Sequence, residues 1–250
     1  MAALSSFPRP NVAVDVAVLT VIPSRAPRTL PGQLAVVVQR RTSSPEGYAL
    51  PGRFLREEET VAQCVATALR EKVGLSLPVV QPRLLRVFDA PDRDPRGWTI
   101  SMAHYVVVPY AELADVVSEA AARCELVPVD PAGGASGGLG LLFDHDEIVS
   151  SAVATVRERY EVAPDPDGAC GGPFTLAELK VVHEGVHGSL LQRDTFRRRM
   201  QPQLTPYLVN GAQEMRVDGG RPARMWLPAG SDVTPRVLER LTLPRASSDA

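Results

Sequence analysis

The stretch that decides the fold is residues 50–75, which read LPGRFLREEETVAQCVATALREKVGL. Its second half predicts a helix from Thr60 to Val73. Thr60 and Gln63 have the spacing of a capping box, in which each side chain bonds the backbone N–H of the other residue. Apolar residues recur every four positions on one face, at Val61, Val65 and Leu69. Gly74 supplies the left-handed conformation that commonly ends a helix.

Apolar, β-branched segments on both sides of this stretch predict a buried sheet. Strands are expected at residues 12–22, 34–39, 84–88 and 101–108, and further helices at residues 111–123 and 146–160. Loops are expected at residues 24–32, 42–47, 89–97 and 128–140, where Pro, Gly and charged residues gather. The first ten residues are polar and are expected to form a loose arm.

A second unit is predicted after residues 161–173, which are rich in Pro and Gly and which we expect few ordered contacts to cross. Thr175 and Glu178 form another capping box, and Gly188 ends that helix. Its apolar face is formed by Leu176, Leu179, Val182 and Val186. A short helix follows, with Asp194 as its expected cap and Phe196 and Met200 facing the core. Extended pieces at 207–209 and 215–217, a turn at 218–220 and a returning strand at 223–227 complete a hairpin. From residue 232 a short surface helix and a disordered end are expected.

Charge and composition limit the classes of function that are open to this chain. Residues 1–170 carry 16 Lys and Arg against 21 Asp and Glu, whereas residues 171–250 carry 11 against 8. A basic C-terminal part hints at a polyanionic partner. Three widely spaced cysteines exclude a disulfide framework and a cysteine-built zinc site. No apolar run reaches the roughly 20 residues of a membrane span, and no secretory leader is recognised, so a cytoplasmic protein without membrane contact is expected.

Residues 50–75 resemble the Nudix signature, whose usual form is G-x5-E-x7-R-E-U-x-E-E-x-G-U, where U is aliphatic. The matching positions are Pro51, Gly52, Phe54, Glu59, Leu69, Glu71, Gly74 and Leu75. The surrounding order of strands agrees over residues 10–160. The resemblance implies an α+β fold, an α/β/α sandwich around a mixed sheet, that handles nucleoside diphosphates.

The departures from the signature concern its metal-binding carboxylates. Arg53 stands at the first Gly, Thr67 and Ala68 replace the catalytic Arg-Glu pair, and Lys72 replaces the second closing Glu. Mg²⁺ requires oxygen ligands in octahedral geometry, and a Lys ammonium opposes its binding. We therefore predict a protein without catalytic residues, metal or required cofactor, in which weak residual pyrophosphatase activity stays open.

A cationic pocket is expected to persist without the chemistry, because Arg side chains suit a diphosphate. The candidate ligand-binding residues are Arg40, Arg41, Arg53, Phe54, Arg56, Glu59, Glu71, Arg96 and Trp98. The segment from Asp92 to Trp98 is similar to a loop of Nudix proteins that act on ADP-ribose. It could bring Arg96 to the phosphates or ribose and Trp98 to the base, or be a turn held by Asp–Arg bonds. His145 is expected to cap or pack.

Together with the tail, the chain resembles the Nudix-related transcriptional regulator family, NrtR, in which a Nudix-like domain precedes a winged helix-turn-helix. The matching pieces are VHEGVHG, FRRRM and GGRPARMW, in that order. The implied domains are a sensing domain at 10–160, a linker at 161–173, a DNA-binding domain at 174–228 and a tail at 229–250. Helical geometry places Arg198 opposite Phe196, toward a major groove. Candidate DNA-binding residues are Arg193, Thr195, Arg197, Arg198, Arg199, Arg221 and Arg224.

The resemblance implies a homodimeric repressor of NAD metabolism genes that binds a palindromic operator in double-stranded DNA and has ADP-ribose or a related nucleotide as effector. Residues 161–173 and the helix before them are the expected hinge. Two alternatives stay open: an active hydrolase of ADP-ribose or a similar nucleoside diphosphate that uses Glu59 and Glu71, and an adaptor whose tail binds a protein. His183 and His187 are four apart on a helix but lack a third ligand at suitable spacing, so no metal site is expected there.

Overall fold

The computed structural model describes residues 6–27, 29–76, 81–120, 123–130, 139–217 and 221–231. Its centre is a seven-stranded sheet in the order β3-β2-β1-β6-β5, with β4 beside β1 and β7 beside β2. The strands are β1 (Asn11–Ile22), β2 (Gln33–Arg41), β3 (Gly47–Ala49), β4 (Gly52–Phe54), β5 (Arg83–Phe88), β6 (Thr99–Val107) and β7 (Cys124–Pro128). β1 and β6 run parallel and the other pairs antiparallel. The expected mixed sheet of an α+β fold is confirmed.

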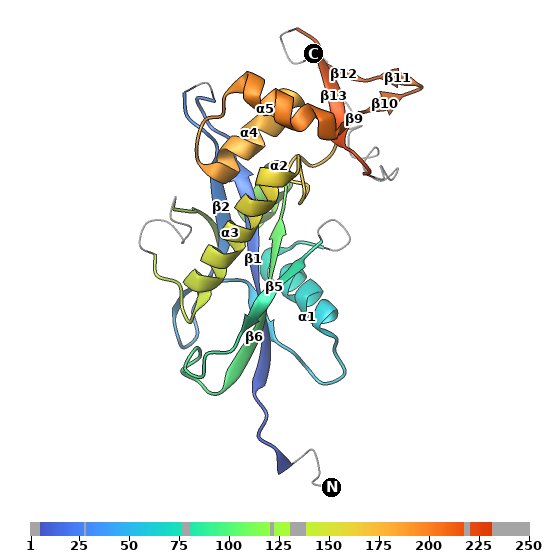
Figure 1. The fold of residues 1–250 in the computed structure, drawn as a ribbon. Helices are drawn as coiled ribbons and strands as arrows, with labels where there is room; N and C mark the ends of the chain where they lie inside the picture. Colours follow the sequence, from blue (N-terminus) through green and yellow to red (C-terminus); the bar gives the residue numbers. More distant parts are fainter. Residues whose placement is uncertain are drawn as a thin grey trace, which may run out of the picture.

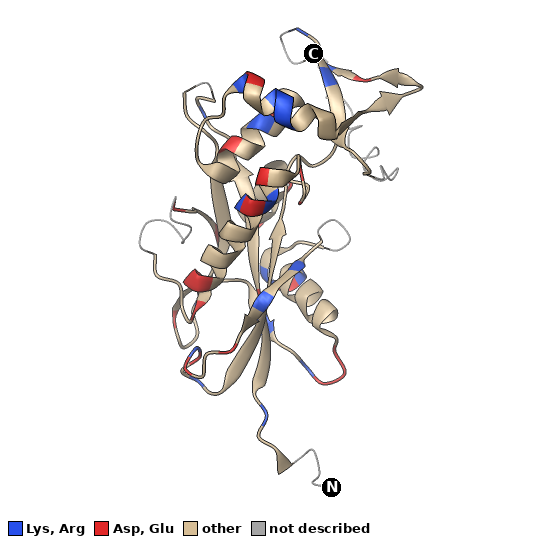
Figure 2. Cartoon of the chain, in the orientation of Figure 1, with Lys and Arg blue, Asp and Glu red and all other residues tan. Residues whose placement is uncertain are grey.

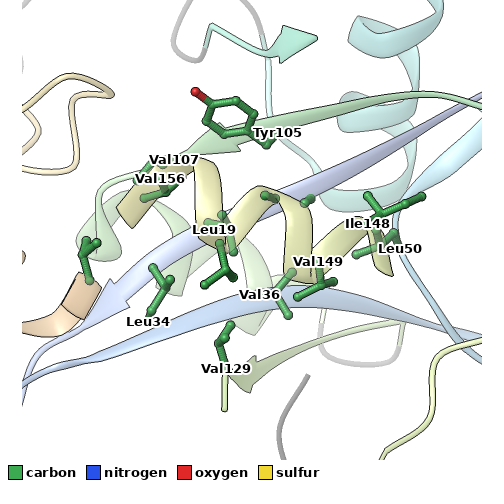
Figure 3. Packing of buried hydrophobic residues seen from close by; sticks show 14 of the residues in the cluster. Leu19, Leu34, Val36, Leu50, Tyr105, Val107, Val129, Ile148, Val149 and Val156 are labelled. Carbon is green, nitrogen blue, oxygen red and sulfur yellow. The ribbon is translucent and has the colours of Figure 1, made fainter. Parts of the chain in front are cut away.

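Both faces of the sheet are covered by helices, which explains why β1 is apolar along nearly all of its length. Val14, Val16 and Val18 pack with α1 (Val61–Ala68) and α2 (Tyr110–Glu119) on one face. Leu19 and Val21 pack with α3 (His145–Val162) on the other. Figure 3 shows Ile148, Val149 and Val156 of α3 lying over the strands. None of the described helices has the length and apolar character of a membrane span.

The helix expected from Thr60 to Val73 is present, with the capping box of Thr60 and Gln63 formed as predicted. Its last turn, Leu69–Val73, is π-helical, and Gly74 closes it at φ 94°. Several other elements differ from expectation. α2 ends at Glu119 rather than at residue 123, and β3, β4 and β7 were not predicted. These short strands form because their backbone groups pair with those of the long strands β1 and β2. No local sequence pattern reveals such pairing.

The C-terminal part begins with β8 (Phe174–Thr175), α4 (Leu176–His187) and α5 (Arg193–Met200). The capping box of Thr175 and Glu178 and the stop at Gly188 are confirmed. The expected cap Asp194 is wrong, because the Gln192 side chain accepts the Thr195 N–H and caps α5 instead.

Short strands complete this part: β9 (Leu204–Pro206), β10 (Leu208–Val209), β11 (Ala212–Gln213), β12 (Met215–Arg216) and β13 (Ala223–Pro228). β12 and β13 form the expected antiparallel hairpin, and β13 also pairs with β8 and β9. A separate small core joins these strands to α4 and α5, formed by Phe174, Leu179, Phe196, Met200, Leu204 and Trp226. The expected turn at 218–220, most of the expected loop at 128–140, and the end from 232 lie outside the described residues.

Residues 161–173 are well packed, so the expectation that few ordered contacts cross them is wrong. Asp165 accepts hydrogen bonds from Tyr160 and from the backbone of Ala169 and Cys170. Asp167, 3% exposed, forms ion pairs with Arg159 and with Arg83 of β5. Buried carboxylates with such partners order a Pro- and Gly-rich segment that composition alone would leave loose. The position of the domain boundary stays a prediction. Figure 1 shows the C-terminal part at one end of the sheet and the N-terminus at the other.

Candidate functional site

A cavity of about 500 Å³ opens beside β2 and β4 in the sheet. Most of the charged residues in its lining are cations. The charged and aromatic residues that line it are Asp15, Arg40, Arg41, Arg53, Phe54, Lys72, Arg93, Asp94, Arg96, Arg123, Phe143 and His145. Such a lining is suited to a ligand with phosphate groups and a planar ring.

The inner wall of the cavity is a buried network around Asp15, the single charged residue of β1. Its carboxylate accepts a hydrogen bond from Ser101 at 2.7 Å and lies 3.3 Å from the Arg93 guanidinium and 3.4 Å from His145 Nε2. Burial alone would raise the pKa of Asp15, but these neighbours outweigh it and lower the pKa to about 2. Asp15 is therefore an ionised anchor for the wall rather than a proton donor.

The absence of a side chain at Gly52 allows β4 to lie close to Asp15 of β1. A β-carbon at Gly52 would lie 2.2 Å from Asp15 Oδ1 and 2.6 Å from the Val14 carbonyl oxygen. Gly52, which matches the signature pattern, is therefore required for the packing of β4 against β1.

The Arg93 guanidinium joins the network to the start of α3. It contacts both carboxylate oxygens of Asp144, at 2.8 and 2.6 Å, and it is almost fully buried. His145, the next residue, accepts the Leu50 N–H at its Nδ1 at 2.8 Å. This contact and the burial of His145 are what the expected capping or packing role requires. The first turn of α3 is consequently part of the cavity wall.

Arg96 forms the Asp–Arg turn that was one of the two alternatives, and it also lies in the cavity lining. It bonds Asp94 through two side-chain contacts of 2.9 and 2.7 Å, which is the Asp–Arg turn. It also lines the cavity, with its guanidinium carbon 5.4 Å from the Phe54 ring centre and 5.0 Å from that of Phe143. The Arg96 guanidinium thus lies over both rings and gives the cavity lining an aromatic part.

The predicted ligand residues divide into two groups. Arg40, Arg41, Arg53, Phe54 and Arg96 line the cavity. The described lining does not include Arg56, Glu59, Glu71 and Trp98. Glu59 forms an ion pair with Arg53, and Trp98 is half exposed. Sequence reasoning missed Asp15, Arg93, Arg123 and Phe143. A charge inside an apolar strand was the available signal for Asp15.

The residues present do not fit the magnesium site that the fold implies. Two of the helix positions that would carry carboxylates hold Ala68 and Lys72. Glu59 is bonded to Arg53 at 2.5 Å and to the Arg56 N–H at 3.1 Å, and Glu71 is exposed. Among the described residues, no cluster of three or more His, Cys, Asp or Glu side chains could hold a metal ion. The donor set is therefore wrong for an ion that prefers several oxygen ligands.

A second candidate surface lies on α5. Phe196 and Met200 are buried, whereas Arg193, Thr195, Arg197, Arg198 and Arg199 are exposed. Figure 2 shows the cationic side of this helix at the end of the molecule that is remote from the N-terminus. None of these arginines has a carboxylate partner among the described residues, although Arg197 bonds Gln201 at 2.8 Å. Their charge is available to a polyanion.

The hairpin of β12 and β13 adds to this surface. Arg221 and Arg224 are both exposed. Arg216 of β12 was not predicted, and it bonds the Glu178 side chain and the Pro173 carbonyl. Arg216 thereby joins the hairpin to the start of α4, the helix that shares a small core with α5.

The known proteins that are similar to this chain differ in how much of it their similarity covers. No model of a known protein family matches the sequence. The ADPR-responsive transcriptional repressor NtrR of Acinetobacter baylyi is 27% identical over 242 residues, which cover 94% of this chain and 90% of that protein. An ADP-ribose pyrophosphatase of Methanocaldococcus jannaschii is 33% identical over 115 residues, which cover 46% of this chain and 62% of that protein.

Two solved structures are similar to nearly the whole chain. The NrtR of Shewanella oneidensis in complex with a 27mer DNA is 25% identical to this chain and superposes with a TM-score of 0.68. The superposition covers 91% of this chain and 95% of that one. A MutT/nudix family protein from Enterococcus faecalis is 22% identical, with a TM-score of 0.66 over 91% of this chain and 94% of that one, and shows the fold alone. The repressors are similar to this chain along nearly its whole length, whereas the similarity to the pyrophosphatase covers less than half of it.

Proposed function

We propose that the chain is a member of the NrtR family of Nudix-related transcriptional regulators and acts as a transcriptional repressor controlled by ADP-ribose or a related nucleotide. The observation that carries this proposal is that similarity to an ADPR-responsive repressor extends over 94% of the chain, beyond the cavity and into the cationic helix α5. A nucleotide-sized cavity and a free cationic helix in one chain are what such a regulator requires.

The DNA-binding unit is a winged helix-turn-helix in which α5 enters the major groove and the β12–β13 hairpin is the wing. The burial of Phe196 and Met200 supports this role because it leaves the opposite side of α5 to the DNA. One or two arginines of α5 contact guanine and the others contact phosphate. The proposed DNA-binding residues are Arg193, Thr195, Arg197, Arg198, Arg199, Arg221 and Arg224.

The effector site is the cavity in the sensing domain. The aromatic part of the lining, formed by Phe54, Phe143 and the Arg96 guanidinium over them, suits an adenine or ribose, and the cationic part suits a diphosphate. The proposed effector-binding residues remain Arg40, Arg41, Arg53, Phe54, Arg56, Glu59, Glu71, Arg96 and Trp98, with the four outside the lining in supporting positions.

Helix α3 is the proposed connection between the two sites. Its first turn holds the cavity wall through Asp144 and His145. Near its other end, Arg157 donates to the Val186 carbonyl of α4, and the Tyr160 ring lies 5.1 Å from that of His183. Eighteen residues of helix span about 27 Å. An effector that favours one arrangement of these contacts by about 1–3 kcal/mol would change the affinity for DNA correspondingly.

We further propose a cytoplasmic homodimer that binds a palindromic operator at NAD metabolism genes, because a two-fold symmetric protein matches two half-sites in duplex DNA. We also propose that the protein is not a pyrophosphatase, because Thr67, Ala68 and Lys72 supply no carboxylates for a metal ion. The similarity to an ADP-ribose pyrophosphatase keeps hydrolysis as the second candidate function.

A mobility-shift assay on promoter DNA from the gene's own neighbourhood tests the proposal, with and without ADP-ribose. We expect a salt-sensitive shift that ADP-ribose reverses. Liberation of AMP from ADP-ribose is measured in parallel with Mg²⁺ present. Rapid turnover together with no affinity for duplex DNA would contradict the proposal and favour the hydrolase.

A further inference from the structure

We infer that the cavity binds the diphosphate of its nucleotide directly through Arg40, Arg41, Lys72 and Arg123, with no magnesium ion between ligand and protein. The inference deepens the proposed effector site and rests on it for the identity of the nucleotide. Lys72 and Arg123 were not among the candidate ligand residues, and together they make the cavity a metal-independent anion site.

The cations of the cavity fall into two groups according to their partners. Arg53, Arg93 and Arg96 each form an ion pair with a carboxylate. The other four line the same cavity without a carboxylate partner in the part of the chain that the structure describes, and they are Arg40, Arg41, Lys72 and Arg123. Arg41 bonds the carbonyls of Ser44 and Pro45, which orients its guanidinium but leaves its charge uncompensated. Uncompensated positive charge facing one cavity attracts anions into it.

Two hydrogen bonds bring the backbones of three of these cations together although they come from distant segments. The Arg40 N–H donates to the Arg123 carbonyl at 2.9 Å. The Cys124 thiol donates to the Lys72 carbonyl at 3.0 Å, which places Lys72 beside Arg123. Burial raises the pKa of the Cys124 thiol, while Arg123 and Lys72 both act to lower it, as expected for two cations nearby. The cluster is therefore built by β2, the π-helical turn Leu69–Val73 and the start of β7.

This geometry explains how the site can dispense with the metal. A bound diphosphate diester carries two negative charges, which Mg²⁺ ordinarily neutralises in phosphate sites. Here Lys72 is a point charge with three donors, and the arginines offer planar forks that match phosphate oxygens. A magnesium ion beside this cluster would be repelled by the same charges that attract the diphosphate.

The test is isothermal titration calorimetry of the full chain with ADP-ribose, in EDTA and in millimolar Mg²⁺. We expect dissociation constants that agree within about twofold, a difference well below one charge-assisted contact. Inorganic pyrophosphate, titrated in EDTA alone because it chelates Mg²⁺, is expected to bind as well. Binding of ADP-ribose that needs Mg²⁺, or pyrophosphate that does not bind in EDTA, would overturn the inference.

Variants assign the effect to Lys72. Lys72→Gln should weaken pyrophosphate and ADP-ribose about tenfold or more, as for the loss of one charged hydrogen bond, and Lys72→Arg should restore most of the affinity. Arg70→Gln is the matched control, because Arg70 lies on the same turn but is 60% exposed and outside the cavity lining. Equal affinities of Lys72→Gln and wild type would overturn the assignment. Metal-free binding of pyrophosphate without binding of ADP-ribose would support the cation cluster and contradict the proposed effector.

Discussion

Gly185 of α4 lies against Val21 of β1 so closely that a β-carbon on Gly185 would meet Val21 Cγ1 at 2.2 Å. The neighbouring residue, Val186, is fully buried in the sensing domain's core. The first helix of the proposed DNA-binding unit is therefore seated directly on the sheet that lines the proposed effector site. Through this contact, α4 is the helix of the tail that packs on β1 and α3.

Gly185→Ala should disturb this seat. The added methyl group must displace Val21 or α4, and overpacking of this kind costs about 1–3 kcal/mol of unfolding free energy. Urea denaturation followed by circular dichroism measures the loss. Ser189→Ala, at an exposed position just beyond the same helix, is the control and should leave the midpoint unchanged. A Gly185→Ala variant as stable as wild type would show that α4 is not tightly docked.

We expect His183 to make the stability of the junction between α3 and α4 depend on pH. Its ring is buried between Tyr160 and Phe196, and its Nε2 lies 2.6 Å from the Pro164 carbonyl. The pKa of His183 is lowered to about 4, mainly by burial and also by His187 and Arg199, while the hydrogen bond with the Pro164 carbonyl acts to raise it. Because the unfolded chain takes up this proton first, the stability contribution is complete above about pH 6.5 and is lost as the pH falls toward 4.

We expect this loss to amount to about 2–3 kcal/mol for wild type. His183→Gln cannot titrate but can still donate to the Pro164 carbonyl, so the difference in unfolding free energy between the two proteins should shrink as the pH falls from 6.5 to 4. Chemical denaturation at several pH values measures that difference. A constant difference would mean that His183 keeps an ordinary pKa.

Local rules account for the parts of this protein that the sequence predicts well. The capping boxes at Thr60 and Thr175 involve residues only three positions apart, so both helix starts follow from the sequence. The long β-branched run of β1 likewise predicts a strand buried on both faces. Such features depend on neighbours in the chain and need no knowledge of the tertiary fold.

The cavity wall could not be predicted in the same way because its contacts are distant in sequence. The ion pair of Arg93 with Asp144 joins residues 51 positions apart, and that of Arg93 with Asp15 joins residues 78 apart. The ordered segment 161–173 shows the same limit. Its Pro and Gly content predicts a loose linker, whereas Asp167 fixes it through Arg83 on a remote strand.

Restoring carboxylates at positions 68 and 72 should create metal affinity at a cost in stability. Ala68→Glu combined with Lys72→Glu returns two oxygen ligands beside Glu71, and calorimetry should detect Mg²⁺ binding that wild type lacks. Ala68 is fully buried, so a charged side chain there should cost at least about 2 kcal/mol of unfolding free energy. Lys72→Glu alone is the comparison and should show the smaller stability loss. Equal Mg²⁺ binding by wild type would contradict the conclusion that its donor set excludes the ion.

Arg198 is the residue of α5 whose removal should reduce DNA binding most directly, because it lies on the side opposite the buried Phe196. If its guanidinium contacts a guanine, Arg198→Ala should cost about 1–3 kcal/mol at the specific operator and relax specificity at that base pair. If it contacts a phosphate, the loss should be similar for all sequences and the salt dependence should fall by about one charge.

Fluorescence anisotropy on operator and scrambled duplexes at several salt concentrations separates these two results. Arg9→Ala is the matched control, since Arg9 is an exposed cation near the N-terminus, at the end of the molecule remote from α5. It removes the same charge from the whole chain and should leave both affinities unchanged. If Arg198→Ala bound both duplexes as wild type does, α5 would not be the helix that enters the groove, and the cationic surface would have to serve another polyanion.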